Sequence, residues 1–304
     1  MTDCERLKNL RVPVGRVDCV LDTDAYNEID DQYAIALLVK HEKINLRALY
    51  ACPFSNGLSS GPEDGMEKSY GEILHLLTLM GREDMKENVY RGSRGYLPDE
   101  KTPLDSPAAR HLCELAGQYS RENPLYVVSI GCITNVASAL LADPSIAEKI
   151  VVVWLGGHAL NWPDTAEFNM VQDISAARVV FGSGCPLVQL PCMGVVSSFY
   201  VTGPELRYWL DGANPLCDYL TAHTVEAAEQ YAKGRVWSRV IWDVTAAAWL
   251  LNDGDRFMRA EVIHAPIPNY DRHYSFDNGR HLMLYVSHIN RDALLEELFR
   301  VLKK

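Results

Sequence analysis

The chain has 304 residues, of which 48% are hydrophobic and 23% are charged, the balance of a globular protein with enough apolar residues for a large core. The formal net charge of −11, with 29 basic and 40 acidic residues and no Lys/Arg run, argues against nucleic-acid binding. No apolar run approaches the roughly 20 residues of a membrane span, and charges stand where a signal peptide needs an apolar core, so we expect a cytoplasmic protein.

Short apolar runs rich in β-branched residues alternate with stretches of helical period along the first half of the chain. No Pro/Gly/Ser-rich or charge-dense stretch divides the sequence, so we expect residues 1–304 to form a single domain. The pattern predicts strands at 14–21 and 46–52, a short strand within 87–93, and helices at 30–40, 67–80 and 108–119.

The second half continues the alternation and then becomes mainly helical. Continuous apolar runs at 125–130 and 150–155 are typical of strands buried on both faces. Further strands are predicted at 186–190 and 282–287, and helices from Asn135, at 175–181, through much of 204–252 and at 291–302. The order predicts an α/β fold with an open, mostly parallel central sheet flanked by helices. In such sheets ligands bind beyond the carboxyl ends of the strands.

An acidic cluster follows the first predicted strand. Five carboxylates fall within residues 22–31, and at one strand end they would repel one another unless they splay into water or a cation holds them. Hard oxygen ligands in this number favour Ca²⁺ or Mg²⁺ over zinc, and the segment holds no His or Cys. The alternative is an acidic loop that only caps the helix starting near Asp30.

Four segments together resemble the inosine-uridine nucleoside hydrolase family. The strand followed by DTD and then DD is similar to that family's DxDxGxDD signature, and three later segments match in order and approximate spacing: GCITN at 131–135, GG at 156–157 followed by Asn161 and AEFN at 166–169, and Trp242-Asp243. The resemblance covers essentially the whole chain. It implies a nucleoside hydrolase fold with a Rossmann-like core and an N-ribosyl hydrolase acting on nucleosides.

The resemblance also implies a calcium site. Asp24, Asp31, Asp243 and the backbone carbonyl of Thr134 would hold Ca²⁺, a mixture of oxygen ligands that suits this ion. Asp24 would also act as general base on a bound water, and Asp22 would orient its neighbours. Alternatives stay open: Thr134 is also a residue that caps helices, and Asp243 is favoured at a helix N-terminus by the dipole.

A second set of residues would hold the ribose. The resemblance implies contacts to the sugar hydroxyls and to the positive charge that develops on the ring, from Asp30, Asn161, Glu167 and Asn169, with Asn56 as a further candidate. The alternative for the segment 161–169 is a solvated loop. His158 lies in the same segment and is a candidate for substrate contact, although a lone loop histidine is more often a packing or surface residue.

The sequence departs from the family pattern at two places. Trp242 stands where many members carry a histidine, which resembles the purine-preferring branch that stacks an aromatic ring on the base; Trp242 could equally be a core residue. Asp24 and Asp30 are separated by two residues more than usual, and no glycine lies between them, so this turn must follow a different path and can bring Asn27 or Glu28 into the pocket.

Several functions remain open at this point. The leading prediction is Ca²⁺-dependent hydrolysis of ribonucleosides to ribose and free base in nucleoside catabolism, with purines preferred. Alternatives are a hydrolase of a modified or unusual N-riboside and a nucleoside-binding protein without turnover. A haloacid-dehalogenase-like phosphatase also begins with a strand and DxD, but it normally needs a DD pair on a separate motif. The resemblance suggests a homodimer or homotetramer.

Overall fold

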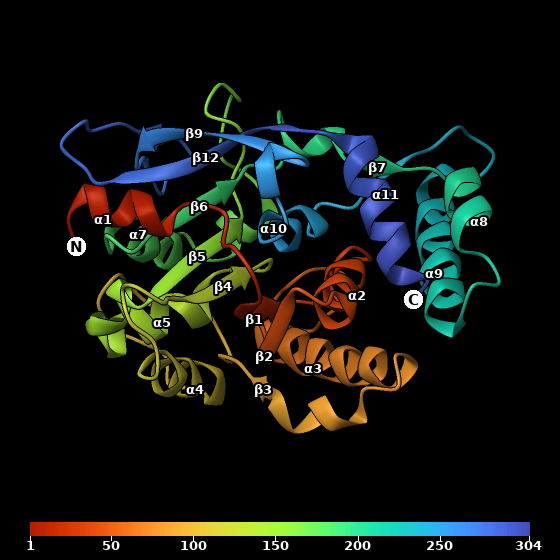
Figure 1. The fold of residues 1–304 in the computed structure, drawn as a ribbon, viewed down its shortest axis with the longest axis horizontal. Helices are drawn as coiled ribbons and strands as arrows, with labels where there is room; N and C mark the ends of the chain where they lie inside the picture. The colour runs from red at the N-terminus through yellow and green to blue at the C-terminus, as the bar shows by residue number, and fades with distance from the viewer.

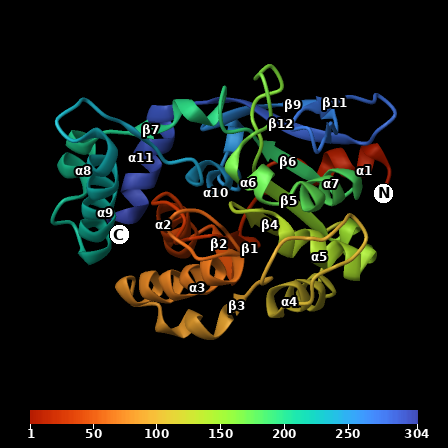
Figure 2. The same cartoon turned by 180° about the vertical axis from the view of Figure 1, so that it is seen from behind.

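The computed structural model describes residues 1–304 and is organised around one eight-stranded sheet (Figures 1 and 2). The strand order is β3-β2-β1-β4-β5-β6-β12-β9. Every neighbouring pair is parallel except β12 and β9. The strands are β1 (Val17–Thr23), β2 (Ile44–Ala51), β3 (Val89–Arg91), β4 (Leu125–Ser129), β5 (Ile150–Leu155), β6 (Leu187–Leu190), β9 (Met258–His264) and β12 (Leu282–Ile289).

The chain direction across the sheet reverses between β1 and β4. From β1 the chain proceeds outward through β2 to β3, and it then returns to add β4, β5 and β6 on the other side of β1. In open parallel sheets this reversal leaves a crevice beyond the carboxyl ends of the two central strands, where ligands bind. The residues that follow β1, β4 and β5 are therefore placed together at that edge.

Helices cover both faces of the sheet and enclose two apolar cores. Consecutive residues of the central strands point to opposite cores, as Leu21 and Val20 do in β1. The helices are α1 (Asp3–Asn9), α2 (Asp31–Lys40), α3 (Pro62–Leu79), α4 (Pro107–Ala116), α5 (Thr134–Ala142), α6 (Phe168–Gln172), α7 (Ile174–Gly182), α8 (Gly203–Leu210), α9 (Pro215–Ala232), α10 (Val244–Trp249) and α11 (Arg291–Leu302).

The predicted fold class is confirmed, with differences at its edges. The first strand starts at Val17 rather than Val14, whose side chain is fully open to water. The predicted helical region 204–252 consists of α8, α9 and α10, interrupted by β8 (Arg239–Val240), which pairs with β7 (Tyr200–Val201). Strand β9 and a small hairpin of β10 (Ile267–Pro268) and β11 (Tyr274–Ser275) were not predicted. The exposed side of β9 carries mixed polar residues, which hides a strand's periodicity.

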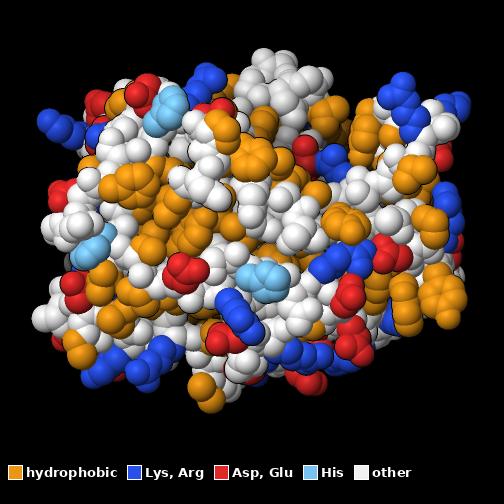
Figure 3. Space-filling view, turned by 90° about the horizontal axis from the view of Figure 1, so that it is seen from above, with side chains coloured by type: hydrophobic (Ala, Val, Ile, Leu, Met, Phe, Trp, Pro, Cys, Tyr) orange, Lys and Arg blue, Asp and Glu red, His pale blue; other side chains and the backbone are white.

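The surface shows scattered charges and several apolar areas. Figure 3, a view from above, shows apolar side chains gathered in the middle of that face between charged ones. All eight cysteines are free thiols, and six of them are buried. None of the helices combines the length and the apolar character needed to cross a membrane. The predicted homo-oligomer stays a prediction.

Candidate active site

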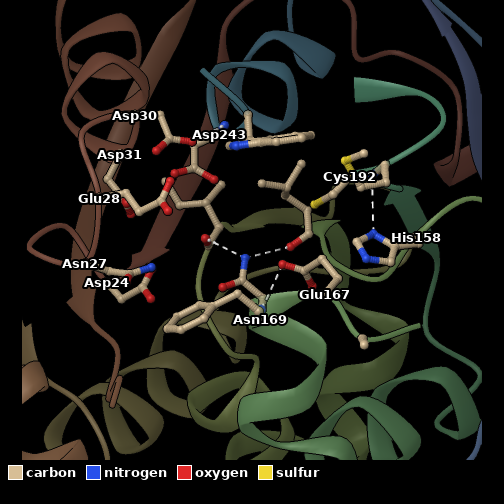
Figure 4. Close-up of a pocket in the computed structure, with 16 residues that line it drawn as sticks. Asp24, Asn27, Glu28, Asp30, Asp31, His158, Glu167, Asn169, Cys192 and Asp243 are labelled. Atoms are coloured by element: carbon tan, nitrogen blue, oxygen red, sulfur yellow. Dashed lines mark hydrogen bonds between the residues drawn. The ribbon is translucent and has the colours of Figure 1, made fainter. Parts of the chain in front are cut away.

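A cavity of about 230 Å³ opens at the carboxyl edge of the sheet, a size that suits one small molecule (Figure 4). Its walls come from the turn after β1, from the ends of β4 and β5, from the segment around α6, and from the start of α10. The lining residues are Asp24, Asn27, Glu28, Asp30, Asp31, Ile130, Leu155, His158, Ala166, Glu167, Phe168, Asn169, Cys192, Met193, Trp242 and Asp243.

Three carboxylates form the tightest group in this cavity. Asp30, Asp31 and Asp243 each offer an oxygen within 4.8 Å of the others, and all three side chains are buried. Asp30 precedes α2, Asp31 is its first residue, and Asp243 precedes α10, so two helix N-termini point at the group. Neither Asp30 nor Asp243 caps its helix with its side chain. Helix capping therefore does not account for these residues.

The carboxylates repel one another in the folded protein. Burial, with the charges of neighbouring carboxylates, raises the pKa of Asp24 and Asp243 well above the usual range. Burial also raises the pKa of Asp30 and of Asp31 to about 6. One carboxylate oxygen of Asp24, Oδ2, is buried without any hydrogen-bond partner. Several hard oxygen donors with an unpartnered buried oxygen among them fit a divalent cation such as Ca²⁺.

Asp24 follows β1 directly and lines the same cavity, but it lies outside the three-carboxylate group. A Cβ at Gly131 would meet Asp24 Oδ1 at 2.9 Å, so this glycine leaves room for the carboxylate in its present position. The sequence assigned Asp24 to the metal and Asp30 to the sugar. In the structure Asp30, rather than Asp24, is grouped with Asp31 and Asp243.

The turn between Asp24 and Asp30 closes without glycine. No residue in it has a positive φ, as expected for a turn that takes a different path from a glycine turn. The backbone N–H of Asn27 donates to the Asp24 carbonyl at 2.7 Å, and the side-chain amide of Gln32 donates to the carbonyls of Ala25 at 3.1 Å and Glu28 at 3.4 Å. Asn27 and Glu28 line the cavity, as the sequence suggested for this longer turn.

Glu167 and Asn169 form the central wall of the cavity. The Glu167 carboxylate accepts hydrogen bonds from the backbone N–H groups of Gly157 at 2.9 Å, Asn169 at 2.8 Å and Met170 at 2.9 Å. Burial nevertheless raises the pKa of Glu167 to about 7. The Asn169 amide donates to the carbonyls of Ile130 at 3.0 Å and Leu155 at 3.1 Å (Figure 4). This wall is therefore held rigidly by the backbone, and it is not a solvated loop.

Three residues assigned from the sequence do not line the cavity. Asn161 is exposed. Asn56 reaches the site only through Asn27, to whose side-chain oxygen it donates at 2.6 Å. Thr134 is buried as the first residue of α5, and its hydroxyl donates to Asp173 at 2.6 Å. Its side chain does not cap α5, so the capping alternative does not hold for this residue.

Asp22 lies behind the cavity rather than in it. It accepts hydrogen bonds from the Asn135 amide at 2.8 Å and the Ser129 hydroxyl at 3.1 Å. Burial raises the pKa of Asp22 to about 6. These contacts tie the end of β1 to β4 and α5.

Trp242 and His158 both line the cavity. Trp242 is half-buried and also packs against an apolar core. Its position is therefore compatible both with stacking on a base and with a structural role in the core. Sequence reasoning did not find Cys192 and Met193, which complete the wall beside His158, or Arg239, which forms an ion pair with Glu28 at the rim. These three residues carry no motif, and only the tertiary fold brings them to the site.

Comparison with known proteins gives a consistent family. The family model described as inosine-uridine preferring nucleoside hydrolase matches residues 19–283. The pyrimidine-specific ribonucleoside hydrolase RihA of Salmonella paratyphi B is 28% identical over 246 residues, which cover 73% of this chain and 76% of that protein. The RihA protein of Salmonella typhi matches to the same extent.

Solved structures share the fold. A plant nucleoside hydrolase, PpNRh1, superposes with a TM-score of 0.76 at 19% identity and covers 94% of this chain and 99% of its own. A purine-preferring ribonucleoside hydrolase from Gardnerella vaginalis gives a TM-score of 0.75 at 20% identity, with 94% and 98% covered.

Proposed function

The chain belongs to the inosine-uridine preferring nucleoside hydrolase family, and from this premise we propose that it hydrolyses the N-glycosidic bond of ribonucleosides with a Ca²⁺ ion bound at the acidic end of the cavity. The observation that carries the proposal is the buried group of Asp30, Asp31 and Asp243, with Asp24 beside it. So many buried carboxylates without a basic partner are costly unless a cation binds them.

The residues of this chain have separate roles in the proposed reaction. Asp31, Asp243 and Asp24 would hold the cation, with Asp30 at the border between cation and sugar, whereas Thr134 does not line the cavity and has no part in this scheme. When bound, a calcium ion would supply positive charge that lowers the pKa of a water molecule at the site. The Asp24 carboxylate would accept a proton from the attacking water as the water oxygen bonds to C1 of the ribose; the C1–N bond breaks, and the base leaves with the bonding electrons and takes a proton from solvent.

The sugar develops positive charge as its bond to the base breaks. Glu167, fixed by three backbone N–H groups, presents a negative charge to the ring, and Asn169 is locked in place beside it. Because these groups do not need to move, they stabilise the charge without a cost of reorganisation. Asn161 and Asn56 have no direct part in this scheme, since neither lines the cavity.

Trp242 supports a preference for purines. Its indole lines the cavity next to Asp243, where it can stack on a base and favour the protonated leaving group through its π face. Relatives of both kinds exist, since one is named pyrimidine-specific and another purine-preferring. Trp242 alone therefore supports the preference.

The decisive experiment is a substrate panel with and without a calcium chelator. We expect reducing sugar to be released from inosine, adenosine and guanosine faster than from uridine, and chelation to stop the release until Ca²⁺ is added back. Tight nucleoside binding without sugar release would instead indicate a binding protein. Turnover that survives complete chelation would contradict the metal site.

A further inference from the structure

The β10–β11 hairpin lies outside the cavity but contacts the wall that carries Glu167. It joins β9 to β12 (Figure 2) and is fixed to α7, because the Arg178 guanidinium donates to the Pro268 carbonyl at 2.8 Å. No residue of the hairpin lines the cavity. Two of its groups nevertheless contact the segment that precedes Glu167, so the hairpin can influence where this carboxylate is held.

The first contact is made by the Tyr274 hydroxyl. The side-chain amide of Gln189, in β6, donates to this hydroxyl at 2.8 Å and to the Gly156 carbonyl at 2.9 Å. The same hydroxyl covers Gly157, where a Cβ would lie only 2.2 Å from it, and Gly157 has a φ of 74°, which glycine adopts without strain. The turn formed by the two glycines is therefore packed between Gln189 and Tyr274.

This turn supports Glu167 directly. The N–H of Gly157 donates to Glu167 Oε2 at 2.9 Å, so a shift of the turn would displace one of the three N–H donors that hold the carboxylate. Burial, and to a lesser extent the charge of Glu167, raises the pKa of Tyr274. The phenol therefore stays neutral and places no second negative charge beside Glu167.

The second contact lies closer to Glu167 along the chain. The backbone N–H of Thr165, a buried residue, donates to the Arg272 carbonyl at 2.8 Å. Arg272 has a φ of 67°, an uncommon conformation for a residue with a side chain, which persists only where the surrounding structure fixes it. The hairpin therefore holds the segment 156–165 at both ends, and Glu167 follows directly after that segment.

We propose that the β10–β11 hairpin clamps the wall that carries Glu167, and that Tyr274 is a positioning residue, which acts on the reaction through Gly157 and Glu167 without contacting substrate. The inference rests on the proposed function. A wall that is fixed before the sugar becomes charged stabilises that charge without reorganisation. Loosening the clamp should therefore slow turnover more than it weakens binding.

The test removes one hydroxyl at a time from the same hairpin. Tyr274→Phe keeps the ring and loses the group that covers Gly157. Tyr270→Phe is the matched control, because its hydroxyl contacts Glu100 at 2.9 Å and Ser175 at 3.2 Å, neither of which lines the cavity. We expect Tyr274→Phe to lower kcat for the best nucleoside of the panel roughly tenfold, with KM and the Kd of Ca²⁺ within about twofold. Tyr270→Phe should leave all three unchanged.

A double-mutant cycle separates positioning from a general loss of structure. If Tyr274 acts through Glu167, Tyr274→Phe should cause no more than about a twofold further loss of kcat in the Glu167→Gln enzyme. A further loss of about tenfold in that background would overturn the inference. An unchanged kcat in Tyr274→Phe, or equal losses in Tyr274→Phe and Tyr270→Phe, would overturn it as well.

Hydrogen exchange gives a second readout that does not need turnover. The amides of Gly157, Asn169 and Met170 all donate to Glu167, and Tyr274→Phe should speed exchange in the peptides that contain them roughly fivefold. Unchanged exchange in these peptides would contradict the clamp. If the unmodified protein cleaves no riboside, the proposed function fails, and the exchange rates still decide whether the hairpin holds the wall.

Discussion

The two carboxylate-bearing walls of the cavity differ in how their charge is balanced. Glu167 accepts hydrogen bonds from three backbone N–H groups, although burial still raises its pKa to about 7. Asp30, Asp31 and Asp243 are equally buried, yet they face one another. Arg239 forms an ion pair with Glu28 at the rim, and its charge opposes part of the rise in the pKa of Asp30.

One wall is stabilised by the protein's own backbone, whereas the other is stabilised fully only when a cation binds. A wall completed by backbone donors is preorganised, and its geometry persists whether or not substrate is present. The carboxylates of the other wall are only partly compensated, by the Thr23 hydroxyl, the Asp243 N–H and the charge of Arg239, so they retain a repulsion that binding of a cation relieves. Substitutions in each wall, and a change of pH, should separate the two behaviours.

The largest effect is expected for Asp24→Asn. The amide keeps the shape of the side chain but cannot accept the proton of the attacking water, so kcat should fall by about a thousandfold. Steady-state release of reducing sugar measures this loss. Asp164→Asn is the matched control, because Asp164 lies in the loop beside the cavity without lining it. Near-normal turnover in Asp24→Asn would show that another group takes the proton.

A smaller loss is expected on the opposite wall. Glu167→Gln removes the negative charge and turns an NH₂ group towards backbone N–H donors, so kcat should fall by about a hundredfold. The Kd of Ca²⁺, measured by calorimetry, should change little, because Glu167 is not in the three-carboxylate group. A large loss of calcium affinity in this variant would mean that the two walls are not independent.

Trp242→Leu should change selectivity more than overall rate. Loss of the aromatic face is expected to lower kcat/KM for purine nucleosides by roughly tenfold relative to uridine. Trp242→Phe retains a ring and should keep most of the preference. Kinetics with inosine and uridine in parallel measure the ratio. An unchanged ratio in Trp242→Leu would assign this residue to the apolar core alone.

The smallest effect is a pH dependence of stability in the calcium-free protein. The pKa values of Asp30 and Asp31 are raised to about 6, so between about pH 4 and pH 6 the folded state holds protons that the unfolded state has released. The free energy of unfolding therefore falls as the pH rises through this window, and Tm should drop by a few degrees.

Calcium should reverse this trend, because it binds the ionised carboxylates and its stabilisation grows with pH. Calorimetric scans of chelated and calcium-loaded protein between pH 4.5 and pH 7.5 measure both trends. Asp31→Asn should weaken the fall in Tm of the chelated protein. A chelated protein whose Tm rises over the same range would show that the carboxylates are not in mutual contact.

Much of the fold and part of the site could be predicted from the sequence. The runs at 125–130 and 150–155 indicated buried parallel strands, and the polar residues after them indicated the binding edge, because the geometry of parallel sheets places these ends together. The acidic cluster and Trp242-Asp243 were recognised as parts of one site through the family motifs, although they are more than 200 residues apart. The cavity lining contains both.

Other features of the site could be found only from the tertiary structure. The sequence does not state that Asp30 rather than Asp24 is grouped with Asp31 and Asp243, since the six-residue separation constrains the carboxylate positions only loosely. Asn161 matches a motif, yet its backbone places it at the surface. The reverse holds for Cys192 and Met193, which reach the cavity without any local pattern.

Gln32, whose amide holds the turn after Asp24, has a consequence for finding this kind of site from sequence. Since the Gln32 amide bridges two carbonyls of the preceding turn, the helix itself supplies the anchor that a glycine bend supplies elsewhere. In this chain the longer bend therefore still brings Asp24 and Asp30 to the same cavity. A sequence pattern with a fixed number of residues and a glycine between the two acidic positions would miss this chain. A pattern that allows a longer gap and a glutamine in the first turn of the helix would include it.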